Sequence, residues 1–327
     1  SPRRMPGPHL ANLRAQDAPA ETIRRALRTG RVHHAYLFEG PDGVGKELAA
    51  FGLAQALVCE KAGDEACGAC SACVRALPDP KTTRPKHPDV VVLERALYEP
   101  AAIGRRTPEN QDLSIDQIRT LVLAHAQFPP HEGRARVFVM RHAEEMSTPA
   151  ANALLKTLEE PIAKMHFILL TSQPDALLPT ILSRVQRVRF APLPDALVIE
   201  LLGARGVTKE TAERVAPLAA GSMEIALSLC DEEETAAREA FVTSALAAID
   251  APTMAATLEL GERAKGDKVA LRIHLLAFAA RLSRIAKEKE NAERWAARYG
   301  DVLQALRDLD ANASPQLTLE SMFIKMR

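Results

Sequence analysis

Aromatic residues and net charge are both scarce in this sequence of 327 residues. Phe, Trp and Tyr together account for 4% of the chain, and Trp occurs once. Lys plus Arg and Asp plus Glu each number 42, so the formal net charge is zero. These shortages argue against a protein that coats nucleic acid through charge alone or through rings stacked on bases, although a local basic patch is compatible with them.

Long apolar segments are lacking as well. No apolar run approaches the roughly 18 residues of a membrane-spanning helix, and residues 1–6 lack the apolar stretch of a signal peptide. We therefore expect a cytoplasmic protein with no membrane contact. The abundance of Ala and Leu favours helix, and the length favours two or three domains over one core.

Cysteine is rare too, but four of the five cysteines fall within fifteen residues. They follow the pattern C-x7-C-x2-C-x2-C, at Cys59, Cys67, Cys70 and Cys73. In a cytoplasmic chain such crowding indicates a metal rather than disulfides. Four thiolates suit a closed, structural Zn²⁺ site better than four reduced core cysteines or a catalytic zinc, which keeps an open position.

A glycine-rich loop stands between an apolar run at 35–38 and a helical pattern at about 47–58. Its sequence is Gly40-Pro41-Asp42-Gly43-Val44-Gly45-Lys46. Strand, glycine loop and helix form the setting of a phosphate-binding loop, in which backbone N–H groups and the helix N-terminus face phosphate oxygens. Lys46 is expected to reach the β- and γ-phosphates.

The residues that would hold Mg²⁺ in such a site are missing. Glu47 stands where the loop needs a Ser or Thr hydroxyl, and it adds negative charge where a triphosphate would lie. A second apolar run at 136–140 is followed by Arg141 and His142, where two acidic residues are expected to hold the metal and activate water. We expect weak or no binding of ATP and no hydrolysis, and an isolated phosphate or ADP held by Lys46 and backbone amides stays an open alternative.

Further apolar runs lie at 90–93, 166–170 and 188–190, with helical patterns between them. This alternation predicts an α/β domain with a mainly parallel sheet over residues 1–192, including the zinc module at 59–73. From residue 193 onward the pattern is helical, which predicts short helices at 193–235 and a domain of longer helices at 236–327. Ser114 and Gln117 have the spacing of a capping box that begins one of the helices.

Residues 33–190 resemble the AAA+ module of bacterial clamp-loader subunits of DNA polymerase III, and the helical remainder is similar in layout to their lid and collar domains. The resemblance is carried by the stretches His33–Phe38, Gly40–Lys46, the four-cysteine insert, His87–Asp89, Ala151–Pro161 and Leu182–Arg184. It implies an AAA+ fold with a zinc insert, followed by an all-α lid and an all-α collar that assembles the subunits.

Within that family the delta-prime type typically lacks the ATPase motifs that the gamma/tau type keeps. Glu47, Arg141 and His142 therefore fit delta-prime better. The family's Ser-Arg-Cys motif is Ser183-Arg184-Val185 here, so the resemblance implies that Arg184 acts in trans as an arginine finger at a neighbour's ATP site. Thr171 matches the family's polar sensor.

These features together predict a clamp-loader stator that helps load the sliding clamp onto primed DNA beside gamma/tau and delta subunits. Two alternatives remain. One is an active AAA+ ATPase subunit of the gamma/tau type, and the other is a freestanding zinc-containing DNA-binding protein.

Overall fold

The computed structural model describes residues 9–61, 65–109, 112–126, 128–160, 162–251, 253–264, 268–288, 291–310 and 313–326. Its contacts divide the chain into two compact units, 1–201 with 220–223, and 202–219 with 224–327. The strands are β1 (Ala35–Glu39), β2 (Val90–Leu93), β3 (Arg136–Met140), β4 (Met165–Thr171) and β5 (Gln186–Arg189).

The helices of the first unit lie between or beside these strands. They are α1 (Asp17–Arg28), α2 (Lys46–Val58), α3 (Ser71–Arg75), α4 (Ile115–Gln117), α5 (Ala124–Ala126), α6 (Thr148–Glu159), α7 (Pro179–Leu182) and α8 (Asp195–Gly203), with a π-helical stretch at Ile118–Leu123 between α4 and α5. Alternation of strands and helices is what the sequence predicts for an α/β domain.

All five strands pair in parallel, in the order β2-β3-β4-β1-β5. In the centre of the sheet, Phe38 of β1 lies opposite Leu170 of β4 and Val188 of β5. The predicted parallel sheet is therefore confirmed. Parallel strands bring their carboxyl ends to one edge, so the segments that follow β1, β2, β3 and β4 emerge together there.

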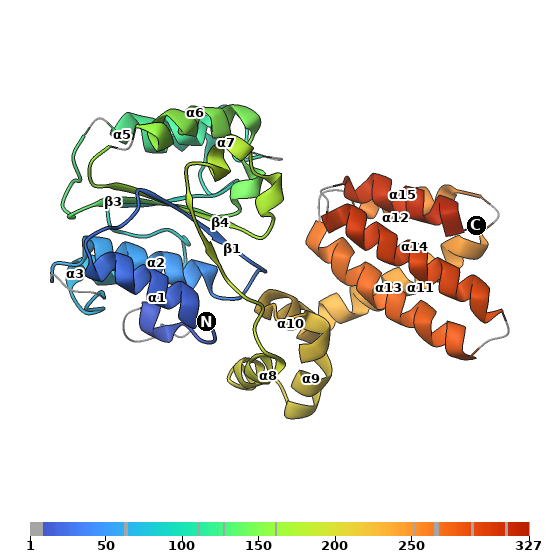
Figure 1. Cartoon of the computed structure of the whole chain (residues 1–327). Helices are drawn as coiled ribbons and strands as arrows, with labels where there is room; N and C mark the ends of the chain where they lie inside the picture. The colour runs from blue at the N-terminus through green and yellow to red at the C-terminus, as the bar shows by residue number, and fades with distance from the viewer. Residues whose placement is uncertain are drawn as a thin grey trace. The chain divides into compact units, whose positions relative to one another are not determined.

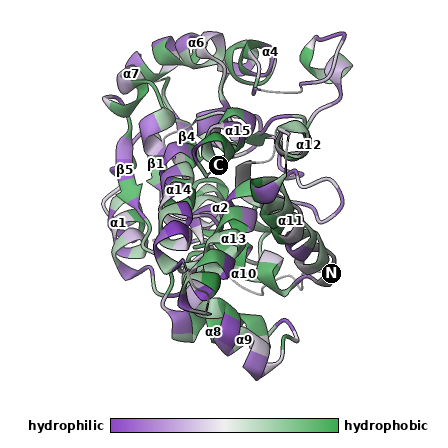
Figure 2. Cartoon of the chain, turned by 90° about the vertical axis from the view of Figure 1, so that its right-hand side faces the viewer, coloured by the Kyte–Doolittle hydropathy of each residue, from purple (hydrophilic) through white to green (hydrophobic). Residues whose placement is uncertain are grey.

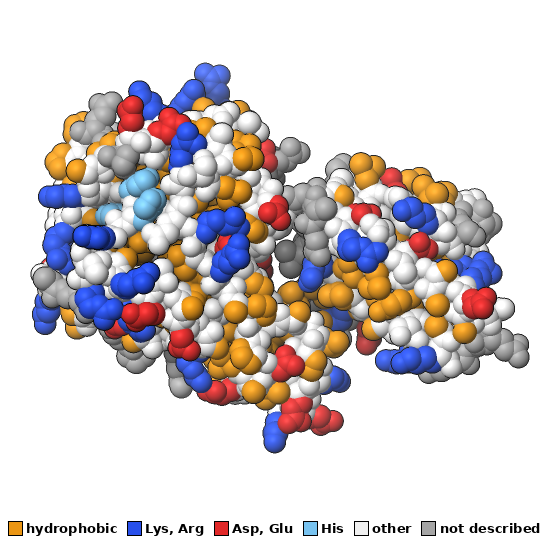
Figure 3. All heavy atoms as spheres, viewed as in Figure 1, with side chains coloured by type: hydrophobic (Ala, Val, Ile, Leu, Met, Phe, Trp, Pro, Cys, Tyr) orange, Lys and Arg blue, Asp and Glu red, His pale blue; other side chains and the backbone are white. Residues whose placement is uncertain are grey.

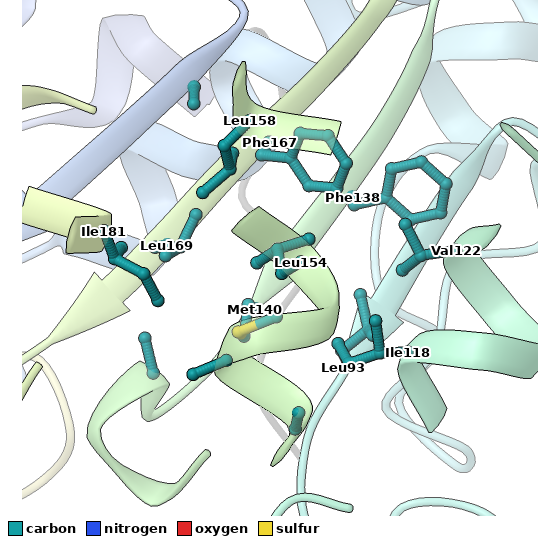
Figure 4. Packing of buried hydrophobic residues seen from close by; sticks show 14 of the residues in the cluster. Leu93, Ile118, Val122, Phe138, Met140, Leu154, Leu158, Phe167, Leu169 and Ile181 are labelled. Atoms are coloured by element: carbon teal, nitrogen blue, oxygen red, sulfur yellow. The ribbon is translucent and has the colours of Figure 1, made fainter. Parts of the chain in front are cut away.

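Helices cover both faces of the sheet. Figure 1 shows α1, α2 and α3 on one side and α5, α6 and α7 on the other, which makes three layers. On the side of α6, Leu154 and Leu158 pack toward Phe167 and Leu169 of β4 (Figure 4). The Phe167 ring stacks on Phe138 of β3, with ring centroids 5.1 Å apart. Burial of these apolar side chains fixes α6 against β3 and β4.

In the described residues of the second unit, all of the regular secondary structure is helical, as the sequence predicts. Its helices are α9 (Lys209–Val215), α10 (Met223–Cys230), α11 (Glu232–Asp250), α12 (Ala255–Arg263), α13 (Lys268–Glu288), α14 (Ala292–Asp310) and α15 (Pro315–Met326). The long helices share one apolar core, in which Phe278 of α13 and Phe323 of α15 are fully buried. The finer division into a lid at 193–235 and a collar at 236–327 stays a prediction.

The predicted capping box at Ser114 is wrong. The Ser114 hydroxyl caps no N–H group and lies buried without a hydrogen-bond partner. Its backbone N–H instead donates to the carboxylate of Glu109 at 2.9 Å, and Gln117 donates to the same carboxylate at 2.5 Å. Glu109 takes the role expected of Gln117 because a charged acceptor forms the stronger bond.

The surface is mixed in character. Figure 2 shows β5 mainly in the hydrophilic colour, as befits an edge strand with three exposed polar residues. Figure 3 shows basic and acidic side chains near one another on the first unit, together with a group of histidines. Among the described residues, no helix combines the length and apolar character required to cross a membrane.

Candidate functional site

The glycine loop lies at the carboxyl end of β1 and leads directly into α2. Its glycines Gly40, Gly43 and Gly45 all have positive φ, at 149°, 75° and 107°. A Cβ at Gly40 would stand 2.3 Å from the carbonyl oxygen of Phe190, so a side chain does not fit there. The backbone of this loop therefore requires glycine at Gly40, where it lies against the end of the sheet.

The Lys46 side chain is folded onto its own loop. Its ammonium group donates to the carbonyl oxygens of Gly40 and Pro41 at 2.6 and 2.7 Å, and pairs with the Asp42 carboxylate at 3.0 Å. Three acceptors match the three N–H donors of a lysine. With 7% of its side chain exposed, Lys46 stabilises the loop from inside.

Glu47 and Arg141, two of the predicted site residues, form an ion pair with each other. The Arg141 guanidinium contacts the Glu47 carboxylate through Nε at 3.0 Å and through Nη2. Its Nη1 contacts the carboxylate of Glu94, which directly follows β2, at 2.7 Å. One guanidinium therefore links the start of α2, the end of β3 and the end of β2.

The Arg141 side chain is mostly buried, with 11% exposed. Burial alone favours the neutral form, but the carboxylates of Glu47 and Glu94 outweigh it, and the pKa of Arg141 lies above its usual value. The ring of Phe51 lies 5.9 Å from the guanidinium carbon, within the range of a cation–π contact. Arg141 is consequently a fixed positive charge at this edge of the sheet.

Three other predicted or neighbouring polar residues occupy the same edge. Thr171 ends β4, accepts the Gly40 N–H through its carbonyl oxygen at 3.2 Å, and accepts the Gln173 N–H through its hydroxyl at 2.9 Å. Glu144 accepts from the Ser172 hydroxyl at 3.2 Å. His142 is exposed and begins the turn after β3 with a φ of 47°.

The four cysteines of the insert converge as the spacing predicts. The sulfur atoms of Cys59, Cys67, Cys70 and Cys73 all lie within 4.8 Å of one another, and none forms a disulfide. Zn–S bonds of about 2.3 Å in a tetrahedron require sulfurs about 3.8 Å apart, and the Cys67 and Cys73 sulfurs are 4.0 Å apart. Gly68, at φ 69°, makes the turn between the ligands. The cluster can hold a metal ion.

Backbone N–H groups point at the sulfur atoms of the cluster and favour their thiolate form. The Cys70 N–H points at the Cys67 sulfur at 3.3 Å, and the Cys73 N–H points at the Cys70 sulfur at 3.4 Å. N–H groups of Ala69 and Cys70 lower the pKa of Cys67 to about 6. Burial raises the pKa of the Cys73 thiol, which a bound cation would offset.

Arg184 lies after α7, and its contacts are with the ends of two helices. Nη1 donates to the Thr180 carbonyl oxygen at 2.8 Å and to the Ser183 hydroxyl at 3.0 Å. Nη2 lies 2.6 Å from the carboxylate of Glu159, the last residue of α6. About a third of the Arg184 side chain is exposed, so the guanidinium is held at the surface.

Sequence reasoning missed three residues that support the loop. The carboxylate of Glu94 forms an ion pair with Arg141, and that of Asp42 forms one with Lys46. The Ser222 hydroxyl donates to the Asp42 carbonyl oxygen at 2.6 Å. A signal existed for Glu94, because it is the first residue after a predicted strand whose end lies at the ligand edge. No local pattern indicates the contact of Ser222, which lies 180 residues from Asp42.

A known protein family and several known proteins are similar to this chain. The family described as "DNA polymerase III, delta subunit" matches residues 15–194, which is more than half of the chain. A solved gamma subunit-related protein of DNA polymerase III from Thermotoga maritima aligns with 94% of this chain and 98% of its own, at 20% identity and a TM-score of 0.48.

Curated relatives carry the names of DNA polymerase III subunits. A gamma/tau subunit of Mycobacterium tuberculosis is 34% identical over 244 residues, covering 72% of this chain and 38% of that protein. Delta' subunits of Bacillus subtilis and Pseudomonas aeruginosa are 32% and 39% identical, covering 59% and 57% of this chain and 53% and 52% of their own. The chain thus spans about half or less of their length. It belongs to the DNA polymerase III, delta subunit, family, and so to the bacterial clamp-loader subunits of the delta-prime and gamma/tau type.

Proposed function

We propose that the chain is a clamp-loader subunit of the delta-prime kind, a stator with a degenerate ATP site that helps load the sliding clamp onto primed DNA beside gamma/tau and delta subunits. The observation that carries this proposal is the ion pair between Glu47 and Arg141. These are the two positions from which a working site would hold Mg²⁺, and here they hold each other.

Electrostatics supports loss of the metal. A fixed guanidinium beside the metal position repels a divalent cation, while Glu47 repels the phosphates that the cation would accompany. Each of these features disfavours Mg·ATP, so the loop serves as a structural turn.

We propose functional roles for two other sites of the chain, Arg184 and the cysteine cluster. Arg184 is our candidate arginine finger, reaching in trans to a phosphoryl group bound by a neighbouring subunit, where a guanidinium stabilises developing charge. Cys59, Cys67, Cys70 and Cys73 would hold one structural Zn²⁺ that cross-links the insert to the end of α2. Function in chromosome replication implies a cytoplasmic location.

A titration of the isolated chain with Mg·ATP, followed by a turnover assay, tests the degenerate site. We expect no binding in the micromolar range and no phosphate release above background. Tight binding with steady hydrolysis would instead favour the active gamma/tau-like ATPase, our second candidate. Tight binding to DNA by the chain alone would favour a freestanding zinc-containing DNA-binding protein.

The finger is tested in the assembled complex. Arg184→Ala should lower ATP turnover of the reconstituted clamp loader several-fold while the melting temperature of the isolated chain stays near that of the wild type. Only about a third of the Arg184 side chain is exposed, but its partners lie at the surface, so we expect little effect of this substitution on the fold. Turnover equal to that of the wild type would reject the finger.

A further inference from the structure

The guanidinium of Arg184 is already oriented before any neighbour is present. One side of it is fixed by the Thr180 carbonyl oxygen and the Ser183 hydroxyl, both in the α7 turn. The other side is fixed by the Glu159 carboxylate, 2.6 Å from Nη2. Because Glu159 ends α6, the guanidinium of Arg184 is held between two elements of the first unit rather than by its own turn alone.

α6 is a rigid support for this contact. Its face toward the sheet contributes Leu154 and Leu158 to the main core. Ser147 caps its first turn by accepting the Ala150 N–H at 3.3 Å. A carboxylate at the end of such a helix has a defined position, whereas an arginine on a surface turn loses rotamer entropy when it is ordered.

The carboxylate and a phosphate present the same kind of acceptor to a guanidinium. Both offer anionic oxygens to its N–H donors, and a guanidinium has five such donors in a planar fork. The contacts with Thr180, Ser183 and Glu159 therefore leave donors for an incoming phosphate oxygen. With about half of its side chain exposed, Glu159 is screened by water and does not cancel the charge that Arg184 presents.

We propose that Glu159 is a positioning residue for Arg184, an inference that rests on the finger role proposed above. Glu159 holds the guanidinium in the orientation in which it meets a neighbour's phosphoryl group, so that little side-chain entropy is lost when the transition state forms. It touches neither nucleotide nor the reacting atoms, and it acts through Arg184 alone.

The test measures ATP turnover of the reconstituted clamp loader containing Glu159→Ala, Glu159→Gln or Glu160→Ala in this chain. Glu159→Ala should lower kcat about three- to tenfold, because an unheld side chain must be ordered during each turnover, and should leave KM for ATP unchanged. Glu159→Gln keeps an oxygen acceptor and should restore part of the loss. Glu160→Ala, at the exposed residue next in sequence, should match the wild type.

A double variant separates this proposal from the finger itself. If Glu159 acts through Arg184, then Glu159→Ala should lower kcat no further once Arg184→Ala is present. Wild-type kcat for Glu159→Ala, beside a loss for Arg184→Ala, would overturn the positioning role and leave the finger standing. Wild-type kcat for Arg184→Ala would instead overturn the finger.

Discussion

The guanidinium of Arg141 pairs with the carboxylate of Glu47, a residue 94 positions earlier in the chain. Together with the contact from Arg141 to Glu94, this pair links the ends of β3 and β2 to the start of α2. Under the function proposed above, Glu47 and Arg141 occupy the two positions from which a working ATPase site would hold Mg²⁺.

Removal of Arg141 should destabilise the first unit. In Arg141→Ala, Glu47 and Glu94 lose their shared cation, and the free energy of unfolding should fall by roughly 2–4 kcal/mol. Glu47→Ala should cost less, about 1 kcal/mol, because half of the Glu47 side chain is exposed. Urea unfolding of both variants and the double variant measures the coupling.

A coupling energy near zero between Arg141→Ala and Glu47→Ala would contradict a stabilising ion pair between these residues. Arg119→Ala is the matched control, since this arginine is exposed on the neighbouring π-helical stretch. It should leave the free energy of unfolding within about 0.5 kcal/mol of the wild type.

Substitution of Lys46 tests whether the glycine loop binds the nucleotide that the clamp loader hydrolyses. Lys46→Ala should leave ATP turnover of the assembled clamp loader unchanged, because the ammonium group binds its own loop. The isolated chain should lose about 1–3 kcal/mol of stability, since acceptors on Gly40 and Pro41 lose a buried donor. A large fall in turnover, with the complex still assembled, would mean that this chain binds the nucleotide that is hydrolysed.

The cysteine cluster predicts one zinc per purified chain. Cys73→Ser should abolish zinc retention, measured by elemental analysis, because Cys73 is buried at the centre of the cluster. Cys230→Ser is the control, since Cys230 lies in α10 of the other unit, and it should retain the metal. Zinc in the Cys73 variant at the wild-type level would contradict the assignment.

Removal of the metal by a chelator should lower the stability of the protein. Removal of the metal leaves thiols with no shared cation, so the chelated protein should melt at a lower temperature than the zinc-bound form. Identical melting curves with and without a strong chelator would mean that the cluster holds no stabilising ion.

Acid should destabilise the first unit through two partly buried histidines, His34 and His166. Burial, with repulsion from His33, lowers the pKa of His34 below the usual 6.5, and burial likewise lowers the pKa of His166. As the pH falls below 6.5, the unfolded chain therefore binds more protons at these two histidines than the folded chain does. The stability that the neutral histidines give the folded chain is fully present above pH 6.5 and is lost as the pH falls through their folded-state pKa values. His166→Gln should show a smaller loss of unfolding free energy between pH 7.5 and 5.5 than the wild type.

Gly40→Ala tests the backbone of the loop. The new Cβ would meet the Phe190 carbonyl oxygen at 2.3 Å, and the residue has a φ of 149°. The expected cost is about 2 kcal/mol or more in urea unfolding. Gly300→Ala in α14 is the control, because its Cβ meets no atom within 4 Å and alanine favours helix. This variant should be as stable as the wild type or more so.

Much of the fold was predictable because its signals are local. The strands at 90–93 and 136–140 have the predicted bounds, since short apolar runs between loops and helical patterns are typical of buried parallel strands. The cysteine cluster was also predictable, because C-x2-C steps bring sulfurs together within one turn of chain. The capping box failed because Ser114 lies close to Glu109, whose charge competes for the same donors.

The amino-acid sequence alone was enough to predict the parallel sheet, the helical second half, the cluster of four cysteines and the basic pair Arg141 and His142 directly after β3. These properties follow from periodicity, spacing and residue type along short stretches. The folded structure was needed to show that Arg141 contacts Glu47 and Glu94, that Lys46 contacts its own loop, and that Glu159 contacts Arg184. Such contacts join residues distant in sequence, and they depend on strand order and helix packing, which bring side chains within hydrogen-bonding distance only once the core has formed.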